Sequence, residues 1–197
     1  MEWTILVESC FRIKAPYKRA SNNANNNMPE KKLLILNKQQ IQQKLDRMAY
    51  QILEDNFDEN EILIAGILPR GNHIAERLKT ILDGIAPFKS RLLTIELEKQ
   101  SSSLSANIDF EVEECSNKVV ILVDDVLNSG KTLAYGFGVF LDVPLKKLRT
   151  AVLVDRNHKS FPITTDFAGV ALSTVIKEHV DVVLDEEDGE EDAVYLR

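Results

Sequence analysis

One stretch of the chain, VVILVDDVLNSGKT at residues 119–132, combines residues that could bind phosphate with two adjacent carboxylates. Its ending, Gly130-Lys131-Thr132, is typical of the nucleotide-binding P-loop, which also requires a glycine five positions before Gly130. Asp125 stands at that position instead. Because a carboxylate there would repel the polyphosphate that the missing glycine would wrap, the pattern argues against a P-loop kinase or NTPase.

The same stretch suits a single phosphate attached to a sugar. A polar turn that would open a helix follows the two acids, and it consists of Asn128, Ser129, Gly130, Lys131 and Thr132. Backbone N–H groups and hydroxyls at a helix N-terminus can bind one phosphate. The carboxylates of Asp124 and Asp125 can accept hydrogen bonds from vicinal sugar hydroxyls or hold Mg²⁺. The stretch therefore predicts a ribose 5-phosphate site; the alternative is a buried strand followed by an incidental polar turn.

Helices and strands alternate along the chain, and they must position this turn. Asn37 can cap a helix with Gln40 as its capping-box partner, and apolar residues at helical spacing predict that helix over about 38–56. A second helix begins at Gly71 and ends near Gly84, and a third covers 131–141. Short apolar runs predict strands at 33–36, 62–65, 91–97, 118–123, 148–154, 167–171 and 180–184.

This alternation predicts an α/β domain with a mostly parallel central sheet flanked by helices. Residues 118–123 are continuously hydrophobic, as in a strand that is buried on both faces. Ligands of such sheets bind at the carboxyl ends of the strands. The turns of interest therefore follow residues 66, 97, 123 and 154.

Three segments of the chain differ in composition. Residues 21–27 read SNNANNN, a polar run that cannot form a core, so we expect residues 1–28 to be a disordered or appended segment. A short extra strand at residues 4–7 is the alternative. Residues 29–184 would form the folded domain. Residues 185–197 contain seven acids and one base, and we expect them to form a solvated acidic tail.

Charge and cysteine content limit the classes of protein to which this chain could belong. The net charge is −7, and the acidic segment alone carries −6, so the rest of the chain has no general attraction for nucleic acid. RNA binding is disfavoured, although a local basic patch would permit it. The two cysteines suggest no disulfide framework, and we expect a reducing, cytoplasmic location. No apolar run reaches the roughly 18 residues that span a membrane.

The stretch at residues 119–132 is also where the sequence resembles a known family. VVILVDDVLNSGKT resembles the phosphoribosyl-pyrophosphate motif of type I phosphoribosyltransferases, which has an apolar strand, two acids and a small-residue phosphate loop. Three further runs resemble the subgroup of pyrimidine-operon regulators that double as uracil phosphoribosyltransferases: ILNKQQIQQKLDRMAYQILEDN, GILPRGNHIAERL and AVLVDRNHKSFPITTDFAG. The resemblance covers roughly residues 30–184 and implies the type I phosphoribosyltransferase fold with a small hood.

The resemblance implies a transfer reaction in nucleotide salvage. A nucleobase, uracil first, would displace pyrophosphate from phosphoribosyl pyrophosphate with Mg²⁺ as cofactor. Asp124 and Asp125 would face the ribose and the metal ion, and residues 128–132 would hold the 5-phosphate. Catalysis of this kind needs positioning and charge stabilisation, and it requires no protein nucleophile.

Two other turns receive roles from the resemblance. Pro69-Arg70-Gly71 would bind the pyrophosphate, with Arg70 as a charge-assisted contact and Gly71 permitting close approach of the backbone. Considered alone, this turn would be interpreted as an ordinary surface turn. Asp155 and Arg156 end the next expected strand, where the family places its base pocket and further pyrophosphate contacts.

One segment departs from the family pattern. The relatives have a flexible loop with an arginine that closes over the pyrophosphate, whereas the corresponding residues 96–107 contain acids, Lys99 and no arginine. Acids in such a lid would weaken pyrophosphate binding. A non-catalytic sensor of phosphoribosyl pyrophosphate or nucleotide, regulating pyrimidine genes, therefore remains the alternative to an active transferase. The family also implies a homodimer.

Overall fold

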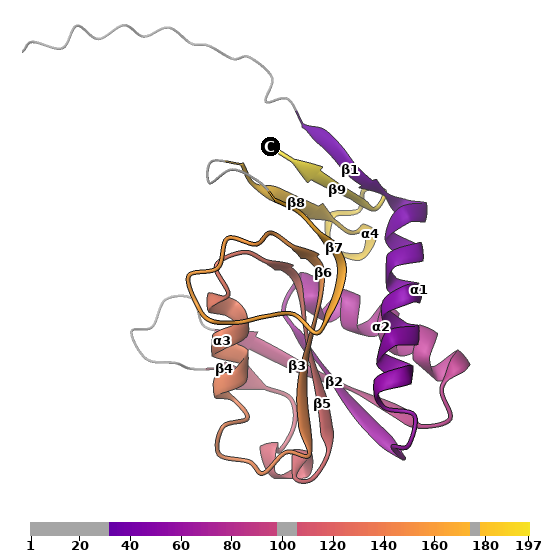
Figure 1. The fold of residues 1–197 in the computed structure, drawn as a ribbon, viewed down its shortest axis with the longest axis vertical. Helices are drawn as coiled ribbons and strands as arrows, with labels where there is room; N and C mark the ends of the chain where they lie inside the picture. The colour runs from indigo at the N-terminus through magenta and orange to yellow at the C-terminus, as the bar shows by residue number, and fades with distance from the viewer. Residues whose placement is uncertain (1–31, 98–105, 174–177) are drawn as a thin grey trace, which may run out of the picture. The chain divides into compact units, whose positions relative to one another are not determined.

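The computed structural model of the protein describes residues 32–97, 106–173 and 178–197. The N-terminal segment with its alternative strand at 4–7 lies outside the described residues, as does most of the expected lid. The described residues form one six-stranded sheet, one three-stranded sheet and the helices that flank them (Figure 1). Among these residues, no helix is both long enough and apolar enough to cross a membrane.

The central sheet has the strand order β4-β3-β2-β5-β6-β7. All neighbouring strands run parallel except β3 and β4, which are antiparallel. The prediction of a mostly parallel α/β sheet is therefore confirmed. The strands are β2 (Glu61–Ile67), β3 (Lys89–Leu97), β4 (Ala106–Ile108), β5 (Val119–Leu127), β6 (Lys147–Asp155) and β7 (Phe167–Ala171).

Helices cover both faces of this sheet, because its strands alternate two sets of apolar side chains. In β2, Ile62 and Ile64 pack with α1 (Lys38–Asp55) and α2 (Arg70–Ile85), whereas Leu63 and Ala65 pack on the opposite face with α3 (Lys131–Gly138). A short 3-10 helix, η1 (Val112–Cys115), also adds buried Cys115 to the α3 face. The predicted capping box of α1 is confirmed, since Asn37 and Gln40 exchange two hydrogen bonds of 2.9 Å.

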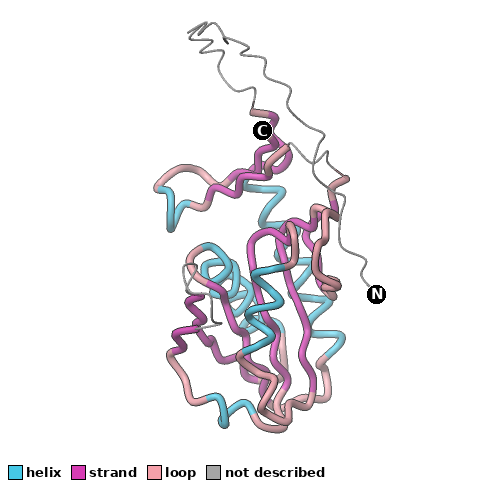
Figure 2. The backbone as a smooth tube through the Cα atoms, turned by 90° about the vertical axis from the view of Figure 1, so that its left-hand side faces the viewer, coloured by secondary structure: helices cyan, strands magenta, loops and turns pink. Residues whose placement is uncertain are grey.

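The second sheet is the small hood that the fold implies. It contains β1 (Leu33–Asn37), β9 (Ala193–Leu196) and β8 (Val180–Val183), with β9 in the middle and antiparallel to both neighbours. Figure 2 shows these strands beyond one end of the central strands. The hood therefore joins the beginning of the described chain to its C-terminal end.

The expectation of a solvated acidic tail at residues 185–197 is wrong for residues 192–196, whereas residues 185–191 are exposed as expected. Residues 185–188 form a short helix, α4 (Asp185–Asp188), and β9 follows it as the central hood strand. The apolar run Ala193–Leu196 explains the difference, because Val194 packs into the core and is fully buried. The acids just before it are held by basic side chains of α2.

Two element bounds near the phosphate turn also differ from the predictions. We expected the strand at residues 118–123 to end at Val123, but β5 continues through both acids because Asp124, Val126 and Leu127 still pair with β6. The helix predicted over 131–141 ends at Gly138. Glycine stabilises helices poorly, and the chain leaves α3 after two glycines to bury Phe140.

Candidate functional site

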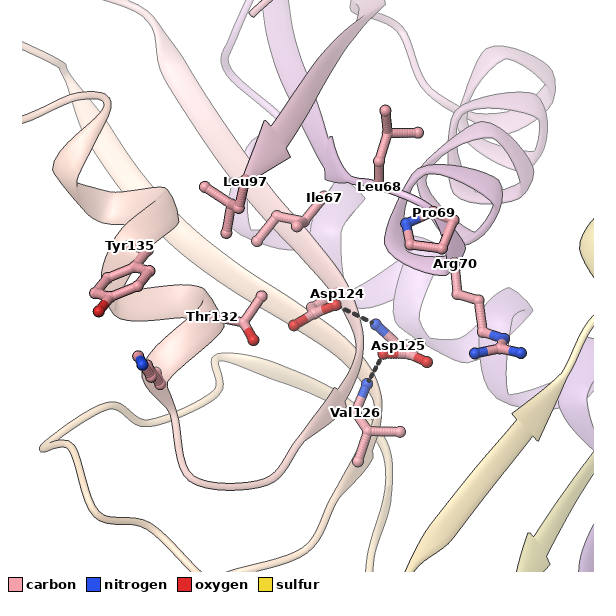
Figure 3. Close-up of a pocket in the computed structure, with 11 residues that line it drawn as sticks. Ile67, Leu68, Pro69, Arg70, Leu97, Asp124, Asp125, Val126, Thr132 and Tyr135 are labelled. Carbon is pink, nitrogen blue, oxygen red and sulfur yellow. Dashed lines mark hydrogen bonds between the residues drawn. The ribbon is translucent and has the colours of Figure 1, made fainter. Parts of the chain in front are cut away.

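A cavity of about 330 Å³ lies where the carboxyl ends of β2, β3 and β5 meet the first turns of α2 and α3 (Figure 3). This is the edge at which parallel α/β sheets bind ligands. The cavity is lined by Ile67, Leu68, Pro69, Arg70, Leu97, Asp124, Asp125, Val126, Lys131, Thr132 and Tyr135. It therefore brings together the acids, the expected pyrophosphate turn and part of the expected phosphate turn.

The acidic pair lies between the two helices. In Figure 3, Thr132 and Tyr135 project from α3 on one side of the acids, and Arg70 lies on the other side. Asp124 is almost fully buried, with 7% of its surface exposed. The backbone N–H group of Asp125 donates to Oδ1 of Asp124 at 3.0 Å, which orients the Asp124 carboxylate.

Asp125 carries charge at some energetic cost. Burial raises the pKa of the Asp125 carboxyl, and the Val126 N–H group, at 2.7 Å from Oδ1, together with the charge of Arg70, opposes that rise only in part. A carboxylate that lacks water is stabilised by a nearby positive charge. The pair would therefore gain from a cation or from donating hydroxyl groups in the cavity.

These two acids fit the Mg²⁺ ion that the family implies. The ion prefers oxygen ligands, and it is usually held by one or two carboxylates while substrate oxygens and water complete its shell. Within the described parts of the chain, no group of three or more acidic, histidine or cysteine side chains could hold a metal. Asp124 and Asp125 would thus need ligands from the substrate.

The phosphate turn forms a second, smaller recess beside the acids. It has a volume of about 120 Å³ and is lined by Asp124, Val126, Leu127, Asn128, Ser129, Gly130, Thr132 and Leu133. Gly130 has a φ of 83°, a left-handed conformation that favours glycine, and α3 begins at the next residue. The hydroxyl of Ser129 accepts from the Lys131 N–H group at 3.3 Å. The turn thus directs a helix N-terminus toward a recess of phosphate size.

Asp155 and Arg156 lie outside the linings of both cavities. The Asp155 carboxylate accepts from Lys159 at 3.1 Å and from Thr165 at 3.0 Å. Arg156 is 3% exposed and donates to the side chain of Asn128 at 3.1 Å. In this structure both side chains therefore contact protein groups next to the phosphate turn.

The expected pyrophosphate turn opens α2. Pro69 precedes the helix, and its peptide bond with Leu68 is cis. Gly71 packs directly against β5, because a Cβ there would lie 2.7 Å from the Val123 carbonyl oxygen and 2.9 Å from Cα of Asp124. The close approach expected at Gly71 is thus one between helix and strand, and it brings the turn beside the acidic pair.

The hood places acids around the exposed side of α2. Asp188 pairs with Arg70 at 3.0 Å, and Arg77 binds both Glu186 and Asp192, the latter at 2.6 Å. His73 lies 3.4 Å from Glu187. The arginine expected to contact pyrophosphate therefore has an acidic partner from α4.

Several residues that line the larger cavity were not predicted from the sequence. The apolar ones, among them Leu97 and Val126, carried no local signal of a binding role. Tyr135 was detectable, because it follows Lys131 by one helical turn and must share its face. The Lys131 ammonium lies 5.3 Å from the centre of the Tyr135 ring. Asp188 was missed because its segment was expected to be solvated.

Comparison with known proteins agrees with this arrangement. The family described as phosphoribosyl transferase domain matches residues 34–187. The chain belongs to the phosphoribosyltransferase family. The family predicted from the sequence is thereby confirmed, and its common theme is transferase activity in nucleotide metabolism.

Two groups of relatives of this phosphoribosyltransferase stand out. The "Bifunctional protein PyrR" of Fusobacterium nucleatum is 32% identical over 177 residues, covering 86% of this chain and all of the relative. The protein of that name from Pelotomaculum thermopropionicum is 36% identical, covering 86% and 98%. The solved hypoxanthine phosphoribosyltransferase of Trypanosoma cruzi shares the fold, with a TM-score of 0.69 at 18% identity, covering 83% and 95%.

Proposed function

We propose that the chain transfers ribose 5-phosphate from phosphoribosyl pyrophosphate to a nucleobase, with Mg²⁺ as cofactor. The bond between C1 of the ribose and the pyrophosphate oxygen breaks, and a bond from C1 to a ring nitrogen of the base forms. The proton of that nitrogen passes to water, and pyrophosphate leaves. When bound, Mg²⁺ supplies positive charge to the leaving group.

The residues of the cavity then take distinct roles. The turn 128–132 binds the 5-phosphate through its N–H groups, as at other helix N-termini. Asp124 and Asp125 accept hydrogen bonds from the ribose hydroxyls and ligate the metal ion, and these negative charges also favour the positive charge that develops on the ribose. Pro69, Arg70 and Gly71 form the pyrophosphate side, with Arg70 as the charged contact.

A single observation carries this proposal. The acidic pair of β5 lies in one cavity between the first turns of α2 and α3, so it has an anion-binding helix start on each side. A ribose with phosphate at one end and pyrophosphate at the other has the matching order of groups. This order separates the proposal from a P-loop enzyme, which binds one continuous polyphosphate.

Uracil is the first base to test, because the sequence resembles uracil phosphoribosyltransferases of the pyrimidine-operon regulator type. Hypoxanthine and guanine come next, since the names of several structural neighbours contain these bases. Release of pyrophosphate should be measured with phosphoribosyl pyrophosphate, Mg²⁺ and each base in turn. Turnover with one base and none in its absence is the expected result, and no turnover with any base would overturn the catalytic proposal.

A sensor that binds phosphoribosyl pyrophosphate without turning it over is the second candidate. Its support is the ion pair between Arg70 and Asp188, together with the absence of arginine from residues 96–107. Binding of phosphoribosyl pyrophosphate in calorimetry without pyrophosphate release would favour the sensor. The homodimer, the cytoplasmic location and the low affinity for RNA remain predictions, which light scattering, cell fractionation and a salt-dependent RNA shift assay can test.

A further inference from the structure

Arg156 is the most buried charged side chain near the phosphate turn. It is 3% exposed, and a buried guanidinium is costly unless its N–H groups have acceptors. One Nη donates to Oδ1 of Asn128 at 3.1 Å, and the other donates to the backbone carbonyl of Glu178 before the hood strand β8. Its backbone N–H donates to the Leu127 carbonyl at 2.9 Å. Arg156 thus joins the end of β5, the start of the phosphate turn and the hood.

The segment that follows Arg156 fixes the centre of the same turn. The N–H groups of Ser160 and Phe161 donate to the Ser129 carbonyl at 2.9 and 3.0 Å. In a trans peptide the C=O group and the next N–H group point in opposite directions. The N–H group of Gly130 therefore points away from residues 156–165, the side on which a phosphate can reach it.

The segment is itself tied down at both ends. The Asp155 carboxylate accepts from the Asn157 N–H group at 3.0 Å, from Lys159 and, at the far end, from Thr165. The side chains of Phe161 and Ile163 also pack at the position of Gly130, where a Cβ would lie 3.4 Å from each of theirs. Residues 155–165 thus form a closed loop against the outer side of the phosphate turn.

We propose that Arg156 is a positioning residue for the 5-phosphate, acting through Asn128 and the closed loop 155–165 and making no contact with substrate. This inference rests on the proposed function. It differs from the base-pocket and pyrophosphate roles suggested for Asp155 and Arg156, since neither residue lines the cavity at the acids or the recess at the phosphate turn. The loop holds the N–H groups of the turn in place before phosphate arrives, which lowers the cost of binding.

Ligands that share only part of the substrate separate this role from a general loss of structure. In Arg156→Gln, affinity for ribose 5-phosphate and for phosphoribosyl pyrophosphate should fall about tenfold, the loss typical of a hydrogen bond to a charged group. Affinity for inorganic pyrophosphate should stay unchanged, because that ligand uses the turn of α2. Arg149→Gln is the matched control, since Arg149 lies in β6, the strand that ends just before Arg156, and pairs with Asp55 and Asp166 instead.

Hydrogen exchange tests the positioning without any ligand. Backbone N–H groups of residues 127–134 should exchange faster in Arg156→Gln than in the native chain or in Arg149→Gln, while those of β2 stay protected. Asn128→Ala gives a second route if Arg156→Gln folds poorly, because the Asn128 side chain is exposed. If Arg156 acts through Asn128, the double variant should bind ribose 5-phosphate within about twofold of Arg156→Gln.

Two results would overturn the positioning role. One is unchanged exchange at residues 127–134 in both variants, and the other is an equal loss of affinity for pyrophosphate and for ribose 5-phosphate. If the native chain binds neither ribose 5-phosphate nor phosphoribosyl pyrophosphate, the proposed function fails. The exchange comparison would still decide whether Arg156 holds the turn.

Discussion

Two turns at the same edge of the sheet each lead from a strand into a helix, but different interactions hold them. The turn after β5 has a left-handed glycine, and two N–H groups of residues 155–165 fix its Ser129 carbonyl. The turn after β2 has no side-chain cap, and its Arg70 pairs with Asp188 from the hood. The first turn is ordered by backbone contacts, whereas the second presents a charge that is already paired.

This difference separates two ways of binding an anion. A turn whose N–H groups are fixed in advance loses little freedom when phosphate arrives. Arg70, by contrast, must exchange its contact with Asp188 for one with the ligand, so the net gain is the difference between two ion pairs. We therefore expect the 5-phosphate side to set affinity and the pyrophosphate side to respond to charge and salt.

Alanine substitutions at the glycines of the two turns should have different effects, and Gly71→Ala should have the largest. Its Cβ would collide with backbone atoms of β5, so we expect a loss of about 3 kcal/mol in the free energy of unfolding. Urea unfolding measures this loss. Gly84→Ala in the same helix is the control, because a Cβ there meets nothing within 4 Å. Equal stability of the two variants would contradict the packing role of Gly71.

The next effect concerns the acids that hold the hood against α2. Arg77→Met should lower the free energy of unfolding at pH 7 by about 2 kcal/mol, because it leaves Asp192, whose side chain is 6% exposed, without its arginine. Lys79→Met, which breaks an exposed pair on the same helix, should change it by less than about 0.5 kcal/mol. A similar loss in both variants would mean that the hood does not depend on Arg77.

The pH dependence of this effect follows from the carboxylates. The hydrogen bond from Arg77 lowers the pKa of Glu186 below its ordinary 4.5. Burial alone would raise the pKa of Asp192, but its hydrogen bond with Arg77 contributes to a net pKa below the ordinary 3.8. Groups with lowered pKa values stabilise the fold above their unfolded pKa and lose this contribution as pH falls through the folded value. The stability difference between native chain and Arg77→Met should therefore shrink below about pH 4.5. A constant difference down to pH 3 would contradict this account.

Gly130→Ala should affect the ligand more than the fold. The left-handed conformation costs a residue with a Cβ about 1 kcal/mol, a smaller loss than that at Gly71. Affinity for ribose 5-phosphate should fall about tenfold if the turn relaxes to avoid the strain. Gly138→Ala in α3 is the control, because a Cβ there meets open space. Calorimetry with ribose 5-phosphate compares the two variants, and unchanged affinity in Gly130→Ala would remove the turn from the phosphate site.

The smallest expected effect belongs to Asp188→Asn. This change frees Arg70 from a partly exposed ion pair worth up to about 1 kcal/mol, so affinity for pyrophosphate should rise by up to about fivefold. Affinity for ribose 5-phosphate should stay the same. Glu190→Gln, an exposed neighbour in the same acidic segment, is the control. A fall in pyrophosphate affinity would show that Asp188 supports the site and does not compete for Arg70.

The sequence predicted the features that depend on neighbours along the chain. The capping box at Asn37, the buried strand that leads to the two acids and the polar turn after them are all local patterns, and each was found, although the strand runs on through the acids. The features that it missed depend on distant partners. Asp188 and Arg70 are 118 positions apart, and the central hood strand could be recognised only once Ala193–Leu196 had β1 and β8 to pair with.

Asp155 and Arg156 show a second limit of prediction from the sequence. Their position at the end of a strand indicated a site, and they do lie beside one, but chain position alone says nothing about which way a side chain points. The contacts with Thr165 and Asn128 come from a loop that closes back on the strand. Sequence reasoning thus located the edge of the sheet, whereas the protein contacts of these two side chains were not predicted and their substrate-binding roles remain predictions.

The central claim is that the acids of β5 serve a ribose carrying phosphate and pyrophosphate. Calorimetry with phosphoribosyl pyrophosphate and Mg²⁺ tests it most directly, comparing the native chain with Asp125→Asn and with the exposed control Asp142→Asn. We expect binding by the native chain and the control, and binding at least about tenfold weaker in Asp125→Asn because a metal ligand is lost. Equal binding by all three, or no binding by the native chain, would contradict the account.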